Sequence, residues 1–205
     1  LTHQLALDGV SFDLAEGDKL GVVGANGAGK TSLLRVLSGV VIPDAGKVHS
    51  VGVVQSLMET GLGINGDATG YENIQLRLLA AGYNWKQARE LSEPIAAYSE
   101  LDEYLERPVD TYSRGMQLRL SFSIATTLDA DILIMDEWIG AGDAAFREKA
   151  AQRMEELVAA AGIVVLASHN NRLLERICNK GLFLEKGKVR YFGDMGEAIR
   201  RYAEA

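Results

Sequence analysis

This sequence of 205 residues contains a single cysteine and no apolar run long enough to cross a membrane. Cys178 has no second cysteine to pair with, which fits a reducing compartment, and we expect it to be a small buried apolar side chain. The longest apolar runs, residues 132–135 and 163–167, have the length of strands, whereas a membrane-spanning helix needs about 20 residues. No signal peptide is visible. We therefore expect a cytosolic protein that reaches a membrane only through a partner.

Basic charge is also scarce. The 21 Lys and Arg residues are outnumbered by 28 Asp and Glu residues, which leaves a net charge of −7. Without a run of Lys or Arg, this balance excludes a nucleic-acid partner. The length and the 47% apolar content predict one globular domain, residues 1–205, with a substantial core. Because the first residue is Leu1, we expect the true N-terminus to lie upstream.

The most informative motif is GANGAGKT at residues 24–31, with the spacing Gly, four residues, Gly-Lys-Thr. An apolar run before it predicts a strand and an amphipathic run after it predicts a helix, which disfavours a simple Gly-rich turn. The glycines allow backbone N–H groups to turn inward around a polyphosphate, and the helix adds the positive end of its dipole. Lys30 can reach the β- and γ-phosphates, and the Thr31 hydroxyl can bind Mg²⁺. The residues expected to bind the nucleotide here are Gly24, Asn26, Gly27, Ala28, Gly29, Lys30, Thr31 and Ser32.

The apolar pattern predicts an α/β fold of the phosphate-loop type: a mostly parallel sheet with flanking helices and an N-terminal antiparallel β portion. A helical subdomain of about residues 57–122 is inserted in it, and Pro94 should break or kink one of its helices. In such sheets ligands bind at the carboxyl ends of the strands, where the phosphate loop falls. The expected strands are 10–12, 19–23, 48–55, 132–135 and 163–167, followed by a hairpin of 181–185 and 188–192 through Lys186-Gly187.

Acidic residues end one of these strands. Asp136 and Glu137 follow the apolar run 132–135, and such a pair on its own is most often a solvated strand end. Downstream of a phosphate loop the pair indicates more: Asp136 can complete the shell of Mg²⁺, and Glu137 can polarise the attacking water as a general base. His169 follows the next strand and could sense the γ-phosphate, although a lone histidine is usually a surface residue.

A second helix start has two interpretations. Ser113 precedes a helical run and is a good N-cap, which by itself explains the residue. The functional alternative is a second anion-binding helix N-terminus, at which Gly115 allows a close approach.

Taken together, these motifs resemble those of the ATP-binding-cassette (ABC) ATPases over essentially the whole chain. Within that family, four strings are similar to the ATPase subunits that export polysaccharides such as O-antigen and teichoic acid. Those strings are 57–63, 69–74, 112–116 and 142–146. The resemblance implies an ATP-hydrolysing subunit that powers export of a lipid-linked polysaccharide, with ATP and Mg²⁺ bound.

The resemblance also implies partners. ATP would lie between the phosphate loop of one subunit and Ser113 and Gly115 of the other in a head-to-tail homodimer that ATP closes and hydrolysis opens. Asp143 would lie near the dimer contact. The helical insertion would dock a polytopic membrane permease, which places the chain peripherally on the cytoplasmic face of the inner membrane. Alternatives are a soluble ABC-type ATPase without a transporter, or a phosphate-loop kinase or GTPase, for which the base-reading motif is missing.

The sequence departs from the family pattern in three places. No aromatic residue that could stack on adenine precedes Phe12. In the string 112–116, which resembles the signature sequence of the family, Arg114 replaces the first of two adjacent glycines. The glutamine that completes the Mg²⁺ shell has two candidate positions, Gln55 and Glu59, and the spacing leaves both open.

Overall fold

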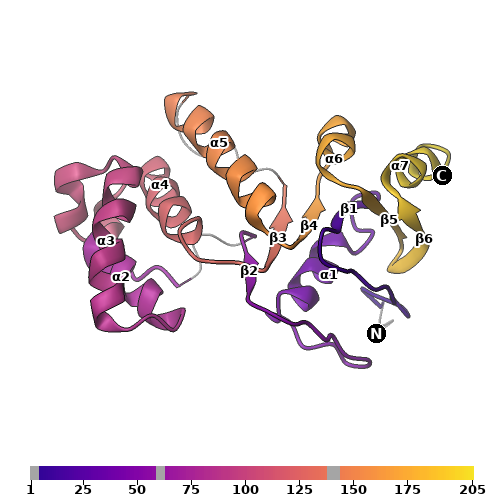
Figure 1. Cartoon of the computed structure of the whole chain (residues 1–205), viewed down its shortest axis with the longest axis horizontal. Coiled ribbons are helices and arrows are strands. Elements are labelled where there is room, and N and C mark those ends of the chain that lie inside the picture. Colours follow the sequence, from indigo (N-terminus) through magenta and orange to yellow (C-terminus); the bar gives the residue numbers. More distant parts are fainter. Residues whose placement is uncertain (1–4, 59–62, 138–143) are drawn as a thin grey trace. The chain divides into compact units, whose positions relative to one another are not determined.

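The computed structural model describes residues 5–58, 63–137 and 144–205 (Figure 1). The chain divides into two compact units. The first unit comprises Leu1–Met58, Ala130–Trp138 and Ala160–Ala205, and the second comprises Glu59–Asp129 and Ile139–Ala159. The sequence prediction of one domain with an insertion at about residues 57–122 stays a prediction.

Among the described residues, six strands of the first unit form one sheet in the order β2-β3-β4-β1-β5-β6. The strands are β1 (Lys19–Val23), β2 (Val54–Ser56), β3 (Ile132–Asp136), β4 (Ile163–Ala167), β5 (Lys180–Glu185) and β6 (Lys188–Asp194). All neighbours pair in parallel except β5 and β6, which form an antiparallel hairpin. The predicted α/β class with a mostly parallel sheet is confirmed.

The central strands are apolar because both faces of the sheet are covered. Leu20 and Val22 of β1 are fully buried, as is Leu182 of β5. The helices of this unit are α1 (Lys30–Leu37), α6 (Asn171–Ile177) and α7 (Met195–Ala203). A Cβ atom on Gly181 would lie 2.5 Å from the Cβ atom of Ala198, so the glycine lets α7 pack closely on β5.

The antiparallel pairing lies at β5 and β6, whereas residues 5–18 contain no strand and the predicted strand 10–12 is not formed. The predicted strand 48–55 is also reduced, because only its end forms β2. The segment before β2 exposes apolar side chains, including Ile42 (88%) and Val51 (81%). A strand requires a hydrogen-bonding neighbour, and no described segment pairs with residues 40–52.

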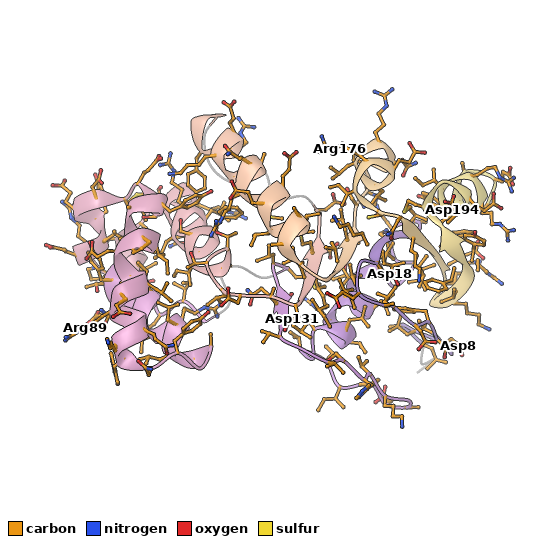
Figure 2. All side chains as sticks on the ribbon, viewed as in Figure 1. Asp8, Asp18, Arg89, Asp131, Arg176 and Asp194 are labelled. Atoms are coloured by element: carbon orange, nitrogen blue, oxygen red, sulfur yellow. The ribbon has the colours of Figure 1, made fainter. Side chains whose placement is uncertain are left out.

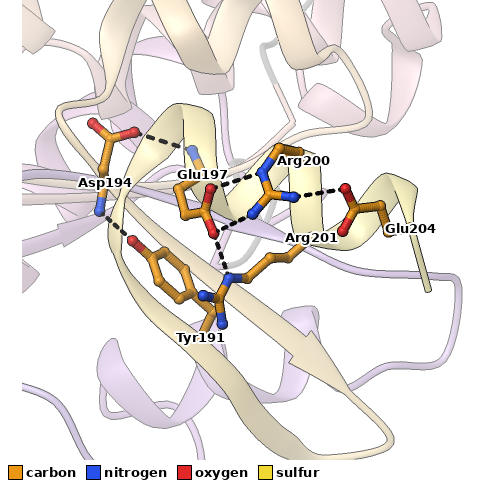
Figure 3. Close-up of polar contacts among 6 residues, drawn as sticks. All are labelled: Tyr191, Asp194, Glu197, Arg200, Arg201 and Glu204. Carbon is orange, nitrogen blue, oxygen red and sulfur yellow. Dashed lines mark hydrogen bonds and ion pairs between the residues drawn. The ribbon is translucent and has the colours of Figure 1, made fainter.

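Helix α7 closes the first unit with a network of charged side chains (Figure 3). Asp194 caps its N-terminus by accepting a hydrogen bond from the N–H of Glu197. The Glu197 carboxylate in turn accepts hydrogen bonds from Arg200 at 2.7 and 2.8 Å and from Arg201 at 2.6 Å. Pairs spaced by three and four residues lie on the same face of a helix, so this network supports α7 locally.

The second unit is helical within the described residues. Its helices are α2 (Gly70–Ala80), α3 (Trp85–Ser99), α4 (Arg114–Ala125) and most of α5 (Ala144–Ala160), with short 3₁₀ turns at Asp102–Glu106 and Val109–Thr111. Capping boxes begin two of the helices, Thr69 with Glu72 and Asn84 with Gln87. The sequence predicts that Pro94 breaks or kinks its helix. Helix α3 continues through Pro94, so the break does not occur.

Two groups of apolar side chains hold this unit together. Ile74, Leu78 and Ile95 are fully buried in one cluster from α2 and α3. The rings of Phe122 and Phe146 lie 6.0 Å apart, edge to face, which packs α5 on α4. Among the described helices of the whole chain, none combines the length and the apolar character that crossing a membrane requires.

Candidate active site

The phosphate loop connects β1 to α1 and requires glycine at several positions. Gly24, Gly27 and Gly29 have φ angles of 156°, 77° and 110°, which residues with a Cβ atom rarely adopt. A Cβ atom on Gly29 would lie 2.6 Å from the carbonyl oxygen of Ala6. Gly29 is also the N-cap of α1 and leaves the first N–H groups of the helix without a side-chain cap. These groups therefore point to an anion site at the start of α1.

Lys30 lies inside this loop. Its side chain is buried, and Nζ donates hydrogen bonds to the carbonyl oxygens of Gly24 at 2.6 Å and Ala25 at 3.2 Å. Burial lowers the pKa of the Lys30 ammonium, while the negative charges of Asp136 and Glu137 act in the opposite direction. A phosphate anion is a stronger partner for this ammonium than two carbonyl groups, so the loop holds a cation suited to polyphosphate.

Thr31 and Asp136 meet beside the loop, as the sequence predicts. The Thr31 hydroxyl donates a hydrogen bond of 2.7 Å to Oδ2 of Asp136, which lies at the end of β3. A hydroxyl and a carboxylate are the oxygen donors that Mg²⁺ prefers, and they fit this ion chemically. Among the described residues, no three His, Cys, Asp or Glu side chains form a metal cluster by themselves. Such a pair suits Mg²⁺, which in phosphate-transfer sites takes few protein ligands together with substrate phosphates.

Glu137 has an unusual backbone and a well-oriented carboxylate. Its φ angle is 70°, in the left-handed region that disfavours residues with a side chain, and its N–H bonds to the carbonyl oxygen of Ala167 at 2.8 Å. The carboxylate accepts hydrogen bonds of 3.0 Å from the Ser168 hydroxyl and from the N–H of His169. Nε2 of His169 lies 3.8 Å from the same carboxylate. The ends of β3 and β4 thus aim an acid toward the loop, at some cost in backbone strain.

These groups line one open pocket of about 770 Å³ in the first unit. Its walls include the phosphate loop, Asp136, Glu137 and His169, as the sequence predicts. They also include Leu5 and Ala6, and the turn of the β5–β6 hairpin, none of which the sequence analysis assigned to the site.

Ser168 is a further residue of the site that the sequence motifs do not indicate. It directly follows the apolar strand β4, precedes His169 and is only 4% exposed. A polar residue that is buried at the end of a strand needs a partner, and here the partner is Glu137. The position after an apolar run was the signal that could have identified it.

The remaining predicted residues lie outside this pocket. Ser113 caps α4 by accepting a hydrogen bond from the N–H of Met116, which confirms its N-cap interpretation. Ser113 and Gly115 are exposed in the second unit, and their role in binding an anion stays a prediction. Gln55 lies half-buried in β2, whereas Glu59 and Asp143 fall outside the described residues, so the choice between Gln55 and Glu59 stays open.

Strand β1 leads through a glycine loop into α1, which carries Lys30 and Thr31, and beside them β3 ends at Asp136 and is followed by Glu137. This is the arrangement of the phosphate-loop nucleotide hydrolases. The chain belongs to the ABC transporter family, whose model matches residues 7–140. It is an ATPase of that family, and the kinase or GTPase alternative is excluded.

Two curated relatives cover most of the chain. The O-antigen export system ATP-binding protein RfbE of Yersinia enterocolitica is 42% identical over 184 residues, which are 90% of this chain and 77% of that protein. The teichoic acids export ATP-binding protein TagH of Staphylococcus haemolyticus is 37% identical over 199 residues, which are 97% of this chain and 75% of that protein.

Solved structures share the fold. An ATP-binding subunit of an ABC transporter superposes with a TM-score of 0.75 at 22% identity, covering 97% of this chain and 87% of its own. The dimeric ATP-binding cassette MJ0796, solved with ADP and Pi, superposes with a TM-score of 0.72 at 19% identity, covering 93% and 90%. At these identities the superpositions establish the α/β fold alone.

Proposed function

We propose that this chain is the ATP-hydrolysing subunit of an ABC transporter that exports a lipid-linked cell-surface polysaccharide, such as O-antigen or a similar glycan. The observation that carries this proposal is the 42% identity to the O-antigen export protein over 90% of the chain. The similarity to the teichoic acid export protein points in the same direction, because both relatives are named for the export of a surface glycan. A soluble ABC-type ATPase without a transporter has no comparable support.

The phosphate loop binds the triphosphate of ATP in this proposal. Lys30 neutralises the β- and γ-phosphates, and the free N–H groups at the start of α1 donate to phosphate oxygens. The loop residues Gly24, Asn26, Gly27, Ala28, Gly29 and Ser32 surround the phosphates. Thr31 and Asp136 would hold Mg²⁺, which supplies positive charge to the phosphate oxygens when bound.

Glu137 acts on the water that attacks the γ-phosphate. Ser168 and the N–H of His169 each occupy one carboxylate oxygen at 3.0 Å, which fixes the direction of the acid. The carboxylate orients the water and accepts its proton as the bond to phosphorus forms. In this proposal the exposed His169 ring, which lines the same pocket, donates to a γ-phosphate oxygen.

The exposed N-terminus of α4 completes the site of a second copy in the proposed head-to-tail homodimer. Ser113 and Gly115 have open space around them, since a Cβ atom on Gly115 would meet only the Ser113 hydroxyl, at 3.9 Å. Two positive helix ends facing one polyphosphate attract each other only while the anion lies between them. ATP therefore closes the dimer and hydrolysis releases it. The chain binds peripherally at the cytoplasmic face of the inner membrane and passes this motion to a polytopic membrane permease.

The test is copurification from detergent-solubilised native cells in the presence of ATP and Mg²⁺. Tagged Glu137→Gln protein should retain ATP and bring down a polytopic membrane protein in a stoichiometric amount. The matched control is Lys30→Ala, which loses the cation for the phosphates. Recovery of only soluble complexes with the Glu137→Gln protein would contradict the export function and would favour an ATPase that works without a transporter.

A further inference from the structure

The turn of the β5–β6 hairpin contains a lysine where the backbone disfavours one. Lys186 and Gly187 form a two-residue connection with φ angles of 47° and 78°, both left-handed. Such turns favour Asn-Gly or Asp-Gly, because a side chain at the first position is strained unless it is short and polar. Gly187 meets this requirement and Lys186 does not, which raises the question of what the lysine does there.

The turn is fixed directly to the phosphate loop. The N–H of Gly187 donates to the carbonyl oxygen of Ala28 at 2.8 Å, and the carbonyl oxygen of Gly187 accepts from the N–H of Asp8 at 2.8 Å. A Cβ atom on Gly187 would lie 2.8 Å from the carbonyl oxygen of Ala6, so the turn packs closely on this segment and only glycine fits at position 187. Lys186 consequently has a defined position, in the wall of the pocket that also contains Lys30.

The other basic residues of this hairpin are paired with acids. Lys180 lies 2.7 Å from Asp18, Lys188 lies 3.1 Å from Asp8, and Arg190 lies 2.8 Å from Glu185. Within the described part of the chain, Lys186 makes no ion pair. It is therefore the cation of the hairpin that is available to an anionic ligand.

The strand order shows which part of a nucleotide this cation faces. The phosphate loop follows β1, and β1 lies between β4 and β5 in the sheet (Figure 1). The carboxyl ends of β4 and then β3 therefore lie on one side of the phosphate loop, and the β5–β6 turn lies on the other. Asp136 ends β3 and Glu137 follows it, and they mark the γ-phosphate because the attacking water must be activated there. The α-phosphate and the nucleoside therefore extend toward the hairpin turn.

We propose that Lys186 binds ATP and ADP at the α-phosphate, as a second cation of the nucleotide site. This proposal rests on the roles proposed above for Asp136 and Glu137, which give the nucleotide its direction. Because the α-phosphate is present in both nucleotides, Lys186 contributes equally to the binding of substrate and product. In contrast, a lysine near the γ-phosphate would favour ATP alone.

The decisive variant is Lys186→Asn, because asparagine suits the left-handed turn position and removes the charge. We expect the Kd values of ATP and ADP, measured by calorimetry at low salt, to rise by a similar factor of roughly ten, the range of a hydrogen bond to a charged group. The Tm of the nucleotide-free protein should stay the same or rise. Lys186→Arg should retain most of the affinity. The matched control is Arg190→Ala, which removes a charge from the same hairpin outside the pocket and should leave both Kd values unchanged.

Three results would overturn this proposal. Unchanged Kd values for Lys186→Asn would show that the lysine does not bind the nucleotide, and weaker binding of ATP alone would place it at the γ-phosphate. Weaker binding of both nucleotides with a lower Tm would indicate damage to the turn rather than loss of a contact. Failure of the wild-type protein to bind ATP would instead refute the nucleotide site itself, which separates this outcome from the other three.

Discussion

The two edges of the sheet, at the amino ends and at the carboxyl ends of its parallel strands, both carry acidic side chains, but these side chains have different roles. Asp18 and Asp131, labelled in Figure 2, lie at the amino ends of β1 and β3. Asp18 accepts a hydrogen bond from Lys180 at 2.7 Å, and Asp131 accepts one from the N–H of Val53 at 2.7 Å. These bonds join β1 to β5, and β3 to the segment before β2. At the carboxyl ends, Asp136 and Glu137 accept bonds from hydroxyl groups beside an open pocket.

The difference shows that position at an edge of the sheet does not decide the role of a carboxylate. Asp18 pairs with the lysine of a neighbouring strand and Asp131 accepts a bond from a neighbouring backbone N–H, so both stabilise the fold, and neither lines the pocket. Asp136 and Glu137 accept hydrogen bonds too, Glu137 from a backbone N–H as well as a hydroxyl, but both line the pocket that contains the buried Lys30. Their remaining lone pairs can therefore bind an ion or accept a proton there. The comparison therefore predicts that changes at the two edges affect different measurements.

The largest effect is expected for Glu137→Gln at the carboxyl edge. Loss of the general base should lower the ATP turnover rate by about a thousandfold, while the Kd of ATP and the Tm change little because the amide has the same shape. Single-turnover hydrolysis and calorimetric binding of ATP provide the measurements. Hydrolysis within a few-fold of the wild-type rate would remove Glu137 from this role.

A smaller effect is expected for Ser168→Ala, which removes one of the groups that orient Glu137. The kcat for ATP should fall about tenfold with an unchanged KM, because the hydroxyl acts on the acid and not on the nucleotide. Steady-state kinetics separate the two constants. Ser123→Ala removes another buried hydroxyl, in the second unit, and serves as the control. Equal losses of kcat in both variants would mean that the effect arises from general damage to packing.

Asp18→Asn at the amino edge should change stability and leave hydrolysis unaffected. Burial raises the pKa of Asp18, but the hydrogen bonds from Lys180 and Ala15 outweigh it, so this pKa lies below the ordinary value of 3.8. The ion pair therefore stabilises the fold by about 1 kcal/mol above pH 4, and this contribution is lost as the pH falls through the depressed pKa. Urea unfolding of the wild-type and Asp18→Asn proteins from pH 7 to pH 3 measures this contribution. If the difference in their free energies of unfolding stayed constant over this range, Asp18 would not stabilise the fold through its charge.

The smallest effect concerns the exposed network of α7, which belongs to neither edge. Hydrogen bonds from Arg200 and Arg201 lower the pKa of Glu197 to about 2. Because this pKa is depressed, the stabilisation is present above the ordinary value of 4.5 and disappears as the pH falls through about 2. Glu197→Gln should lower the Tm at pH 7 by about 2 °C or less, since exposed pairs contribute little. Thermal unfolding at two salt concentrations tests this, because salt should reduce the difference.

Several groups of the site could be predicted because they belong to contiguous strings. The loop 24–31 and the pair Asp136-Glu137 each have a spacing that carries its own chemistry, and the structure brings Thr31 within 2.7 Å of Asp136. In contrast, Ser168 and Lys186 occupy ordinary positions in the sequence, the end of a strand and a hairpin turn. Their importance arises from neighbours that are distant along the chain, Glu137 and Ala28.

The sequence by itself determined the family, the order of strands and helices around the phosphate loop, and the residue types of the site, because these depend on local spacing and local apolar periodicity. Only the tertiary structure decided which apolar runs become strands, since Val51 and its neighbours pair with no described segment despite their β-favouring composition. It also decided the strand order, which places Glu137 on one side of the phosphate loop and Lys186 on the other. Pairing between strands is a non-local contact, and spacing within one run of residues does not encode it.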